Sequence, residues 1–227
     1  MNSRATGPTA LAVGLSLCIT PALLFAQTSE SEEVNLVFYN LKNYLAMERR
    51  VGEKVVEDAP KPENEIRHLI DAIVAMKPDI LGVCELGDAS FMADFKGRLK
   101  QAGVDLPHTE LVTAASGHNR NLALLSRYPL VEVNSRDDYT YVIGETKLPF
   151  QRGVLDVTIA INSRYHLRYL ALHLKSKRDV PEADQALMRL NEARLARQHL
   201  DRIFEEQPGI NLVVMGDFND LRIEPPV

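Results

Sequence analysis

Residues 211–220 read Asn-Leu-Val-Val-Met-Gly-Asp-Phe-Asn-Asp, and they indicate the fold class most directly. The run from Leu212 to Met215 is short, apolar and unbroken, which is typical of a strand buried in a sheet. Asp217 and Asn219 follow at the carboxyl end of that strand. Open α/β sheets place their chemistry outside the carboxyl ends of their strands. The stretch therefore predicts a core strand that delivers two polar side chains to one rim of a sheet.

Three more predicted strands end in polar side chains of this kind. Residues 34–39 lead to Asn40, residues 79–84 lead to Glu85, and residues 167–172 lead to His173. Each of these polar residues alone suits an ordinary turn or an exposed loop. Together with Asp217 and Asn219, they predict five polar groups that converge on one rim.

Helical spacing of apolar residues predicts three helices. The first covers residues 63–76 and the third covers residues 182–204. The second has Phe91, Met92, Phe95 and Leu99 on one face and ends before Gly103. Between the second and third helices we predict only strands, at residues 111–112, 122–125, 139–143, 154–161 and 167–172. Strand and helix units at both ends, with a meander between them, predict two mixed sheets packed on each other with helices outside.

Two connecting segments have their own signals. Residues 49–62 are charged and contain prolines, which predicts a solvated loop. Asn162-Ser163-Arg164 predicts a hairpin turn, and therefore antiparallel pairing of the strands on either side.

The composition fits one domain with a hydrophobic core. The chain has 227 residues, of which 45% are hydrophobic, and this argues against general disorder. Its formal net charge is −5. An acidic chain lacks the basic footprint typical of proteins held to nucleic acid by charge alone. A bound cation can still bring a phosphate to an acidic site, so the charge weakens a nucleic-acid hypothesis without excluding it.

The first 26 residues have the pattern of a secretory signal peptide. Arg4 precedes an apolar stretch over residues 10–25, and polar residues begin after Ala26. A membrane anchor needs roughly 20 apolar residues, whereas this stretch is shorter and is interrupted by Pro21. We therefore expect a signal peptide over residues 1–26, a mature domain over residues 27–227, a secreted or periplasmic location, and no membrane span after cleavage.

The two cysteines have different expected fates. Leu17 precedes Cys18 where a lipoprotein signal would have a small residue, so lipoprotein anchoring at Cys18 is not expected. Cleavage of the signal peptide leaves Cys84 as the sole cysteine, and no internal disulfide can then form. Because Cys84 lies in an apolar run, we predict a small buried hydrophobe rather than a reactive thiol.

Four motifs carry a resemblance to a known family. They are NLVFYNL at residues 35–41, PDILGVCE at 78–85, LHLKS at 172–176 and GDFN at 216–219. In content and in order they resemble motifs of the endonuclease/exonuclease/phosphatase superfamily, the DNase I-like metal-dependent phosphoesterases. The resemblance covers nearly the whole mature chain. It implies a fold of the α/β (α+β) class, a four-layer α/β/β/α sandwich of two mixed β-sheets flanked by helices.

The resemblance also implies a role for each polar residue on the rim. Glu85 would be the main ligand of Mg²⁺, with Asn40 beside it and Asp217 sharing in metal binding, and Mn²⁺ is the alternative ion. Asp217 would orient or deprotonate the attacking water, Asn219 would donate to a phosphoryl oxygen, and His173 would contact the phosphate. These residue types make chemical sense, because a phosphodiester repels nucleophiles and needs positive charge and an oriented water.

Looser matches indicate further substrate contacts. Arg152 resembles the family's phosphate-contacting arginine, with a solvated strand-end charge as the alternative. Asn121, or the other amide of the Asn119-Arg120-Asn121 triplet, would reach the substrate. A basic cluster follows His173 and consists of Lys175, Lys177 and Arg178. It either steers phosphate toward the site or forms a solvated loop.

The C-terminal region departs from the superfamily pattern. The superfamily closes its fold with further strands and a Ser-Asp-His motif, whose Asp and His complete the acid–base machinery. Only eight residues follow Asn219. We therefore expect a domain that is incomplete at its C-terminus, with the last strands of one sheet missing. A chain with such exposed sheet edges would be poorly soluble and nearly inactive.

Three functions compete. The leading hypothesis is a secreted Mg²⁺-dependent hydrolase of phosphodiester bonds in DNA or RNA, an endonuclease-like nuclease. Phospholipids or small phosphate esters are alternative substrates, because substrate choice lies in loops outside the shared motifs. A catalytically inactive binding domain is the alternative of another class, favoured by the missing Asp–His pair and disfavoured by the intact motifs. No stable protein partner is implied.

Overall fold

Two four-stranded sheets pack face to face in the computed structural model, which describes residues 1, 33–115 and 118–221. The chain divides into two units, Met1–Glu33 and Val34–Val227, and both sheets belong to the second. Apart from Met1, the predicted signal peptide lies outside the described residues, as do residues 222–227 at the C-terminus. No helix in the described part of the chain is long and apolar enough to cross a membrane.

The first sheet has the strand order β1-β4-β6-β5. Its strands are β1 (Leu36–Tyr44), β4 (Ile80–Leu86), β6 (Asn121–Ser126) and β5 (His108–Val112). β1 and β4 are parallel, and the other pairs are antiparallel. Helices α1 (Glu63–Met76) and α2 (Ala89–Gln101) cover its outer face through an apolar cluster that includes Ile73 and Phe95. Both predicted helices are confirmed.

The second sheet has the strand order β12-β11-β10-β7. Its strands are β12 (Leu212–Asp217), β11 (His166–His173), β10 (Val154–Ala160) and β7 (Leu130–Val133). β10 and β11 form the predicted antiparallel hairpin, whereas β11 and β12 are parallel. Helix α3 (Gln185–Glu206) packs Ala196 and Ile203 against this sheet.

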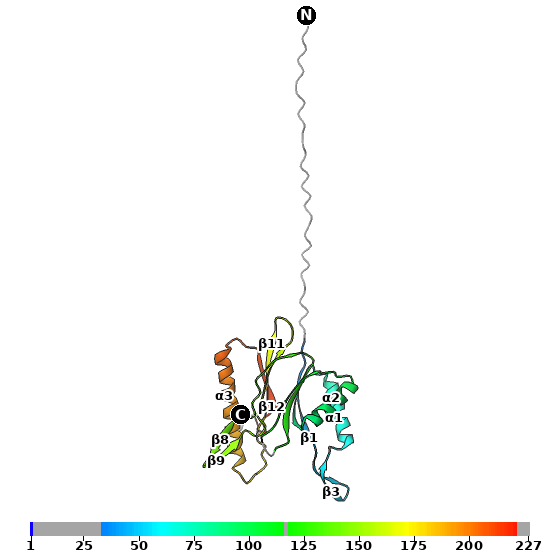
Figure 1. Cartoon of the computed structure of the whole chain (residues 1–227), viewed down its shortest axis with the longest axis vertical. Coiled ribbons are helices and arrows are strands. Elements are labelled where there is room, and N and C mark those ends of the chain that lie inside the picture. Colours follow the sequence, from blue (N-terminus) through cyan, green and yellow to red (C-terminus); the bar gives the residue numbers. More distant parts are fainter. Residues whose placement is uncertain (2–32, 116–117, 222–227) are drawn as a thin grey trace. The chain divides into compact units, whose positions relative to one another are not determined.

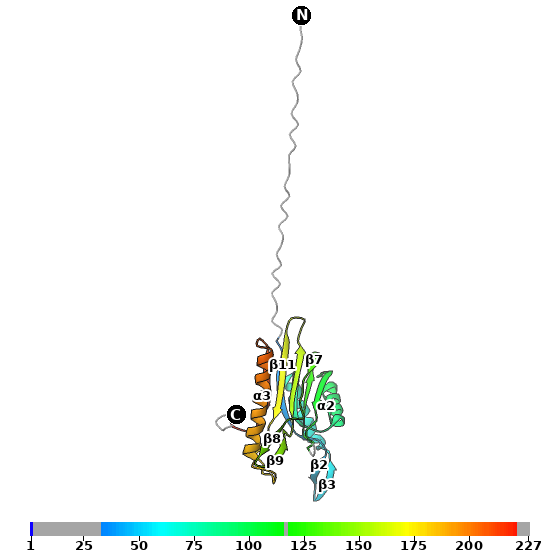
Figure 2. The same cartoon turned by 60° about the vertical axis from the view of Figure 1, so that its left-hand side comes forward.

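The layers follow the order helix, sheet, sheet, helix. Figure 1 shows α3 on one side of the two sheets and α1 with α2 on the other. After the rotation in Figure 2, β11 and β7 lie between α3 and α2. The core between the sheets is built from both of them, with Ile80 and Leu122 from the first and Leu155 and Val157 from the second. The predicted four-layer sandwich is confirmed.

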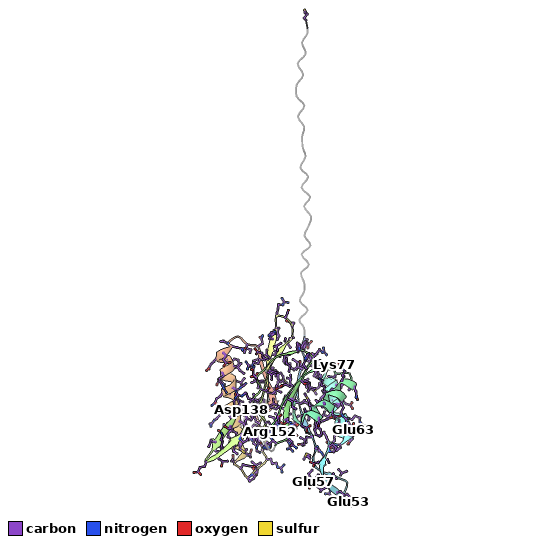
Figure 3. The ribbon with its side chains drawn as sticks, in the orientation of Figure 1. Glu53, Glu57, Glu63, Lys77, Asp138 and Arg152 are labelled. Carbon is purple, nitrogen blue, oxygen red and sulfur yellow. The ribbon has the colours of Figure 1, made fainter. Side chains whose placement is uncertain are left out.

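The prediction of a solvated loop over residues 49–62 is wrong. This segment contains an antiparallel hairpin of β2 (Met47–Val51) and β3 (Lys54–Ala59), with Gly52 at φ +64° in its turn. Only Ala59 is buried in the two strands, so no apolar run marks them in the sequence. Figure 3 shows Glu53 and Glu57 on this projecting hairpin.

Two further strands also lack a clear signal in the sequence. The prediction missed β7 and β9 (Thr146–Pro149), and the latter pairs with β8 (Thr140–Ile143) in a second hairpin. Strands β7, β8 and β9 have only four residues each. Alternation over four residues is too short to separate a strand from an ordinary loop.

Gly82 on β4 lies against Tyr169 on β11 across the core between the sheets. A Cβ atom at Gly82 would overlap the Tyr169 hydroxyl and press on Phe38. The Tyr169 hydroxyl is buried and has no hydrogen-bond partner among the described residues. Glycine is therefore required at this position because the two sheets approach closely there.

Candidate active site

Glu85 reaches the rim through a break in the regular geometry of β4. Its φ of 60° lies in the left-handed region. Leu81, Val83 and Leu86 all pack toward the helices, although strand alternation would turn Leu86 to the opposite face. The pairing of β4 with β6 shifts between Val83 and Leu86. The strand continues two residues beyond the predicted end, so this bulge lies inside it. The bulge takes Glu85 out of the regular alternation of side chains.

The neighbouring strand β1 is irregular at the same level. The prediction that β1 ends at Asn40 is wrong, because the strand continues to Tyr44. Asn40 lies opposite Cys84, the next pair joins Tyr44 to Leu86, and the register shifts between the two. Lys42, in the shifted segment, has a φ of 50°. Both strands therefore deviate where the functional side chains are presented.

One amide holds two carboxylates together. Asn40 Nδ2 donates to Glu85 Oε1 at 3.1 Å and to Asp217 Oδ2 at 2.9 Å. The backbone N–H of Asn43 donates to Glu85 Oε2 at 2.9 Å. Two neighbouring carboxylates supply the hard oxygen atoms that Mg²⁺ and Mn²⁺ prefer, so the residues present fit such an ion. Asn40 Oδ1 accepts from the Lys42 N–H at 2.8 Å, whereas Nδ2 faces the two carboxylates, so the amide must rotate before Oδ1 can bind an ion held between them.

His173 and Asn219 lie beside Asp217. His173 at the end of β11 is paired with Asp217 at the end of β12. The backbone N–H of Asn219 donates to Asp217 Oδ1 at 3.0 Å, and its side-chain Nδ2 donates to the Leu174 carbonyl at 2.9 Å. The loop after β12 is thereby fastened to the end of β11. The predicted convergence of five polar groups on one rim is confirmed.

The His173 imidazole is buried and neutral. The residue is only 2% exposed, and its Nδ1 has no hydrogen-bond partner in the part of the chain that the structure describes. Burial, followed by the nearby Arg152 cation, lowers the pKa of His173 to about 4, against the opposing effect of Asp217. At neutral pH the ring can therefore donate one hydrogen bond and accept another.

Arg152 is buried beside these groups, which excludes the alternative of a solvated strand-end charge. It is 6% exposed, and it lies in a turn closed by the Gly153 N–H donating to the Phe150 carbonyl. Gly153 has a φ of +68°, which favours glycine, and a Cβ there would meet the Arg136 carbonyl. Burial lowers the pKa of Arg152, and Nε has no hydrogen-bond partner among the described residues. Figure 3 labels Arg152 between the α3 side and the α1–α2 side of the molecule.

Asn121 is tied into the fold, and its neighbour Arg120 contacts the site. Asn121 Oδ1 accepts from the Ala114 N–H at 2.7 Å, and Nδ2 donates to the Gly87 carbonyl at 2.8 Å. Arg120 Nε donates to Asn43 Oδ1 at 2.7 Å, next to Glu85. Substrate binding by Asn121 stays a prediction. Sequence reasoning did not single out Arg120, for which the triplet at residues 119–121 was the available signal.

The first residue of the basic cluster supports its own loop. Lys175 is 2% exposed, and its Nζ donates to the carbonyls of Ser176 at 3.0 Å and Arg178 at 2.6 Å. Lys177 forms an ion pair with Asp220 at 3.3 Å. Lys175 is therefore buried and committed to backbone groups, so the solvated-loop alternative is wrong for this residue.

Sequence reasoning also missed Glu192. This residue on α3 has no exposed surface. Its Oε1 accepts from the Gln151 N–H at 3.2 Å, and its Oε2 accepts from the Lys175 N–H at 2.6 Å. One carboxylate thus fastens the turn that carries Arg152 and the loop that follows His173. In the sequence it looks like any charged residue of a long helix.

The four-layer fold and its rim of acidic and amide side chains match the architecture expected from the sequence motifs. The chain belongs to the endonuclease/exonuclease/phosphatase family, whose model matches residues 40–225. The search of curated proteins finds no match.

Three similar solved structures share the fold. A β-hairpin deletion mutant of β toxin from Staphylococcus aureus is 13% identical with a TM-score of 0.57, covering 85% of this chain and 69% of that one. Sphingomyelinase C from Streptomyces griseocarneus is 15% identical with a TM-score of 0.56, covering 84% and 65%. ANGEL2, described as a 2′,3′-cyclic phosphatase, is 16% identical with a TM-score of 0.53, covering 70% and 44%. The chain thus spans between 44% and 69% of their lengths.

Proposed function

We propose that this chain is a divalent-metal-dependent phosphodiesterase. The observation that carries the proposal is the Asn40 amide, which holds the Glu85 and Asp217 carboxylates side by side although they belong to different sheets. Two carboxylates kept close together repel each other unless a cation or a proton lies between them. The arrangement is therefore suited to holding a metal ion.

Glu85 and Asp217 would hold Mg²⁺, or Mn²⁺ in its place, with Asn40 beside them. When bound, the ion supplies positive charge to the phosphate and to the attacking water. The protein's own cations add to that charge. Arg152 has a buried Nε without a partner among the described residues, and Arg120 contacts Asn43, whose backbone N–H donates to Glu85. Both guanidinium groups are suited to phosphate oxygens because they present several donors in one plane.

The remaining groups handle the proton and the orientation of the substrate. Asp217 is half-buried, and each of its carboxylate oxygens accepts one hydrogen bond. A carboxylate oxygen has a second lone pair, so Asp217 can accept the proton of an attacking water. The neutral His173 ring and the second N–H of the Asn219 amide are positioned to donate to phosphoryl oxygens. His173 lies at the end of β11, and Asn219 is held by its hydrogen bonds to Asp217 and to the Leu174 carbonyl.

We propose nucleic acid as the first substrate class to be tested, with phospholipids and small phosphate esters as competitors. The two cationic residues Arg120 and Arg152 at the site support an anionic polymer, whereas the net charge of −5 opposes one. One similar structure is named a sphingomyelinase C. A panel of plasmid DNA, RNA, sphingomyelin and sugar phosphates separates these classes, because only one bond type is expected to be cleaved efficiently.

Hydrolysis of bis-(p-nitrophenyl) phosphate tests the chemistry apart from the substrate class. In a protein that includes the C-terminal strands expected from the family resemblance, we expect turnover that requires Mg²⁺ and that falls at least about 100-fold in Glu85→Gln, because a neutral amide replaces the main metal-binding carboxylate. Glu57→Gln, an exposed change on the β2–β3 hairpin, serves as the control and retains full activity. Undiminished turnover in Glu85→Gln refutes the mechanism. If that protein folds but shows no turnover, the binding-domain alternative is favoured.

We also propose that the protein is exported and cleaved after Ala26. The support comes from the apolar stretch over residues 10–25 and the polar residues that follow it. Protein recovered from the exported fraction is expected to begin at Gln27 on N-terminal sequencing. An intact Met1 in that fraction would contradict cleavage.

A further inference from the structure

A second, softer set of donor atoms lies beside the carboxylate pair. Cys84 Sγ, a ring nitrogen of His173 and a carboxylate oxygen of Asp217 all lie within 4.8 Å of one another. The three residues come from β4, β11 and β12, so both sheets contribute. Cys84 is fully buried and His173 is 2% exposed, whereas Asp217 is half-buried. The cluster therefore extends from the rim into the core between the sheets.

His173 points to a ligand independently of the thiol. Its Nδ1 is buried and has no hydrogen-bond partner within residues 33–115 and 118–221. Most buried polar side-chain atoms in folded proteins have a partner, because an unmet hydrogen bond costs free energy. A cation bound at this nitrogen would meet that requirement. The cluster is then more than a lone cysteine in an apolar core.

We propose that Cys84, His173 and Asp217 form a binding site for a thiophilic divalent cation of the Zn²⁺ class, and that its occupation inhibits phosphodiester hydrolysis. The inhibition rests on the proposed function, whereas binding of the cation does not. Cys84 has no role in the proposed hydrolysis, but His173 and Asp217 are needed there. An ion held by these two residues withdraws them from the substrate.

The donor types favour zinc over magnesium. A thiol, an imidazole and a carboxylate are the usual ligands of Zn²⁺, with bonds of roughly 2.0–2.3 Å. Such bonds place ligand atoms roughly 3–4 Å apart, so small side-chain movements suffice from the observed spacing. Mg²⁺ prefers oxygen atoms and has little affinity for sulfur. The same rim thus offers an oxygen pair at Glu85 and Asp217 and a mixed set at Cys84, His173 and Asp217.

The charges also balance. On binding, the Cys84 thiol releases its proton to solvent and a metal–sulfur bond forms, with no change of oxidation state. The thiolate and the Asp217 carboxylate together neutralise the two positive charges of the ion, and the imidazole ligand is neutral. The attraction between the ion and these two anionic ligands in the low-dielectric core offsets part of the cost of taking the charges out of water. Asp217 is common to both donor sets, so Zn²⁺ and Mg²⁺ compete for it.

Cadmium titration of the full chain tests the binding. The parent protein carries Cys18→Ser, which leaves Cys84 as the sole thiol. We expect a saturable thiolate-to-Cd²⁺ charge-transfer absorption in the ultraviolet, which disappears in Cys84→Ala. Competition titrations with Zn²⁺ should show at least about a tenfold weaker affinity in Cys84→Ala. His166→Gln, which removes an exposed histidine, is the control and should bind like the parent.

The outcomes separate the two proposals. Absence of the charge-transfer band in the folded parent overturns the site, and this result holds whether or not Cys84→Ala folds. A band together with Zn²⁺ inhibition that is lost in Cys84→Ala supports the whole inference. A band in a protein that hydrolyses phosphodiesters equally well with Zn²⁺ bound overturns the inhibition. A band in a protein with no Mg²⁺-dependent turnover supports the site and counts against the proposed function alone.

Discussion

Asn40 Nδ2 donates to Asp217 Oδ2 at 2.9 Å across 177 positions of sequence. Asn40 belongs to the first sheet and Asp217 to the second, so this bond joins the two halves of the sandwich at the rim. The same Nδ2 also donates to Glu85. The amide N–H groups therefore lie between two carboxylates, at a position that would also attract a cation.

Replacing Asn40 should make stability depend on metal. Asn40→Ala leaves two carboxylates without their shared donor, and we expect the free energy of unfolding in EDTA to fall by about 1–3 kcal/mol. Mg²⁺ should restore part of this loss, because a ligand that binds only the folded state stabilises it. Urea unfolding with and without Mg²⁺ measures both effects. Asn119→Ala, at an exposed asparagine, is the control, and an equal response in both variants would contradict the interpretation.

Glu192 should make the folded state less stable as the pH rises from acid to neutral. Burial raises the pKa of Glu192 from 4.5 to about 7, against the lowering effects of Arg152, the two backbone N–H donors and Lys175. Between these values the unfolded chain has released the proton while the folded chain retains it. Each pKa unit corresponds to about 1.4 kcal/mol, so this one group would remove up to about 3 kcal/mol by neutral pH.

Urea unfolding at a series of pH values checks this. We expect the decline between about pH 4.5 and pH 7 to be absent in Glu192→Gln, because glutamine does not titrate. Glu205→Gln, on an exposed part of the same helix, should keep the wild-type profile. Identical profiles for Glu192→Gln and the wild type would show that the buried carboxyl is not the group responsible.

A buried ionic network in the second sheet should be structurally essential. Asp156 has no exposed surface, and its two oxygens accept from Arg168 Nε at 2.7 Å and Nη2 at 2.6 Å. His199 Nε2 lies 2.8 Å from Asp156 Oδ2. Asp156→Ala leaves the Arg168 charge buried without its partner, and we expect a loss of about 3–5 kcal/mol.

The matched comparison is an exposed ion pair. Arg197 and Asp201 on α3 are 2.8 Å apart, with 74% and 45% of their side chains exposed. Asp201→Ala should change the free energy of unfolding by less than about 1 kcal/mol, because solvent screens the charges. Denaturant unfolding of both variants gives the difference. Similar small losses in the two would mean that the Asp156 network contributes no more than a surface pair.

Gly82 and Tyr169 should be coupled. Gly82→Ala places a methyl group against the Tyr169 hydroxyl and should destabilise the protein by about 1–3 kcal/mol. Tyr169→Phe removes a buried hydroxyl that has no partner in the described part of the chain, so by itself it should be nearly neutral. The double variant should recover part of the loss caused by Gly82→Ala. Strictly additive free energies in this double-mutant cycle would refute the contact.

The helices show how much could be predicted from local pattern. Residues 63–76 were predicted as a helix, and α1 has the same bounds. Pro62 precedes it and Pro78 follows it, so both ends carry a local signal. The β2–β3 hairpin carries no such signal, because its strands are mostly exposed and charged. Alternation of side chains is informative only where one face of a strand is buried.

The sequence predicted which residues form the rim of the site, but not their backbone geometry or burial. Asn40, Glu85, His173, Asp217 and Asn219 could be selected because each follows an apolar strand pattern. The left-handed φ of Glu85 could not be predicted from the sequence, because the bulge results from the register between neighbouring strands. The burial of Arg152 and Glu192 was equally hidden, since a charged residue before a strand or in a long helix is ordinarily exposed.

The stretch at residues 211–220 was enough to predict a strand with Asp217 and Asn219 at its end, since apolar runs and strand ends are properties of neighbours along the chain. Its prediction as a buried core strand is wrong, because β12 is half-buried and lies at the edge of the second sheet. The pairing of Asp217 with Asn40, and the placing of Cys84 and His173 next to it, required the packed structure. These residues meet because two sheets approach face to face and because β1 and β4 of the first sheet are irregular at the rim. Contacts of that kind depend on how whole layers fit together, and no local pattern encodes them.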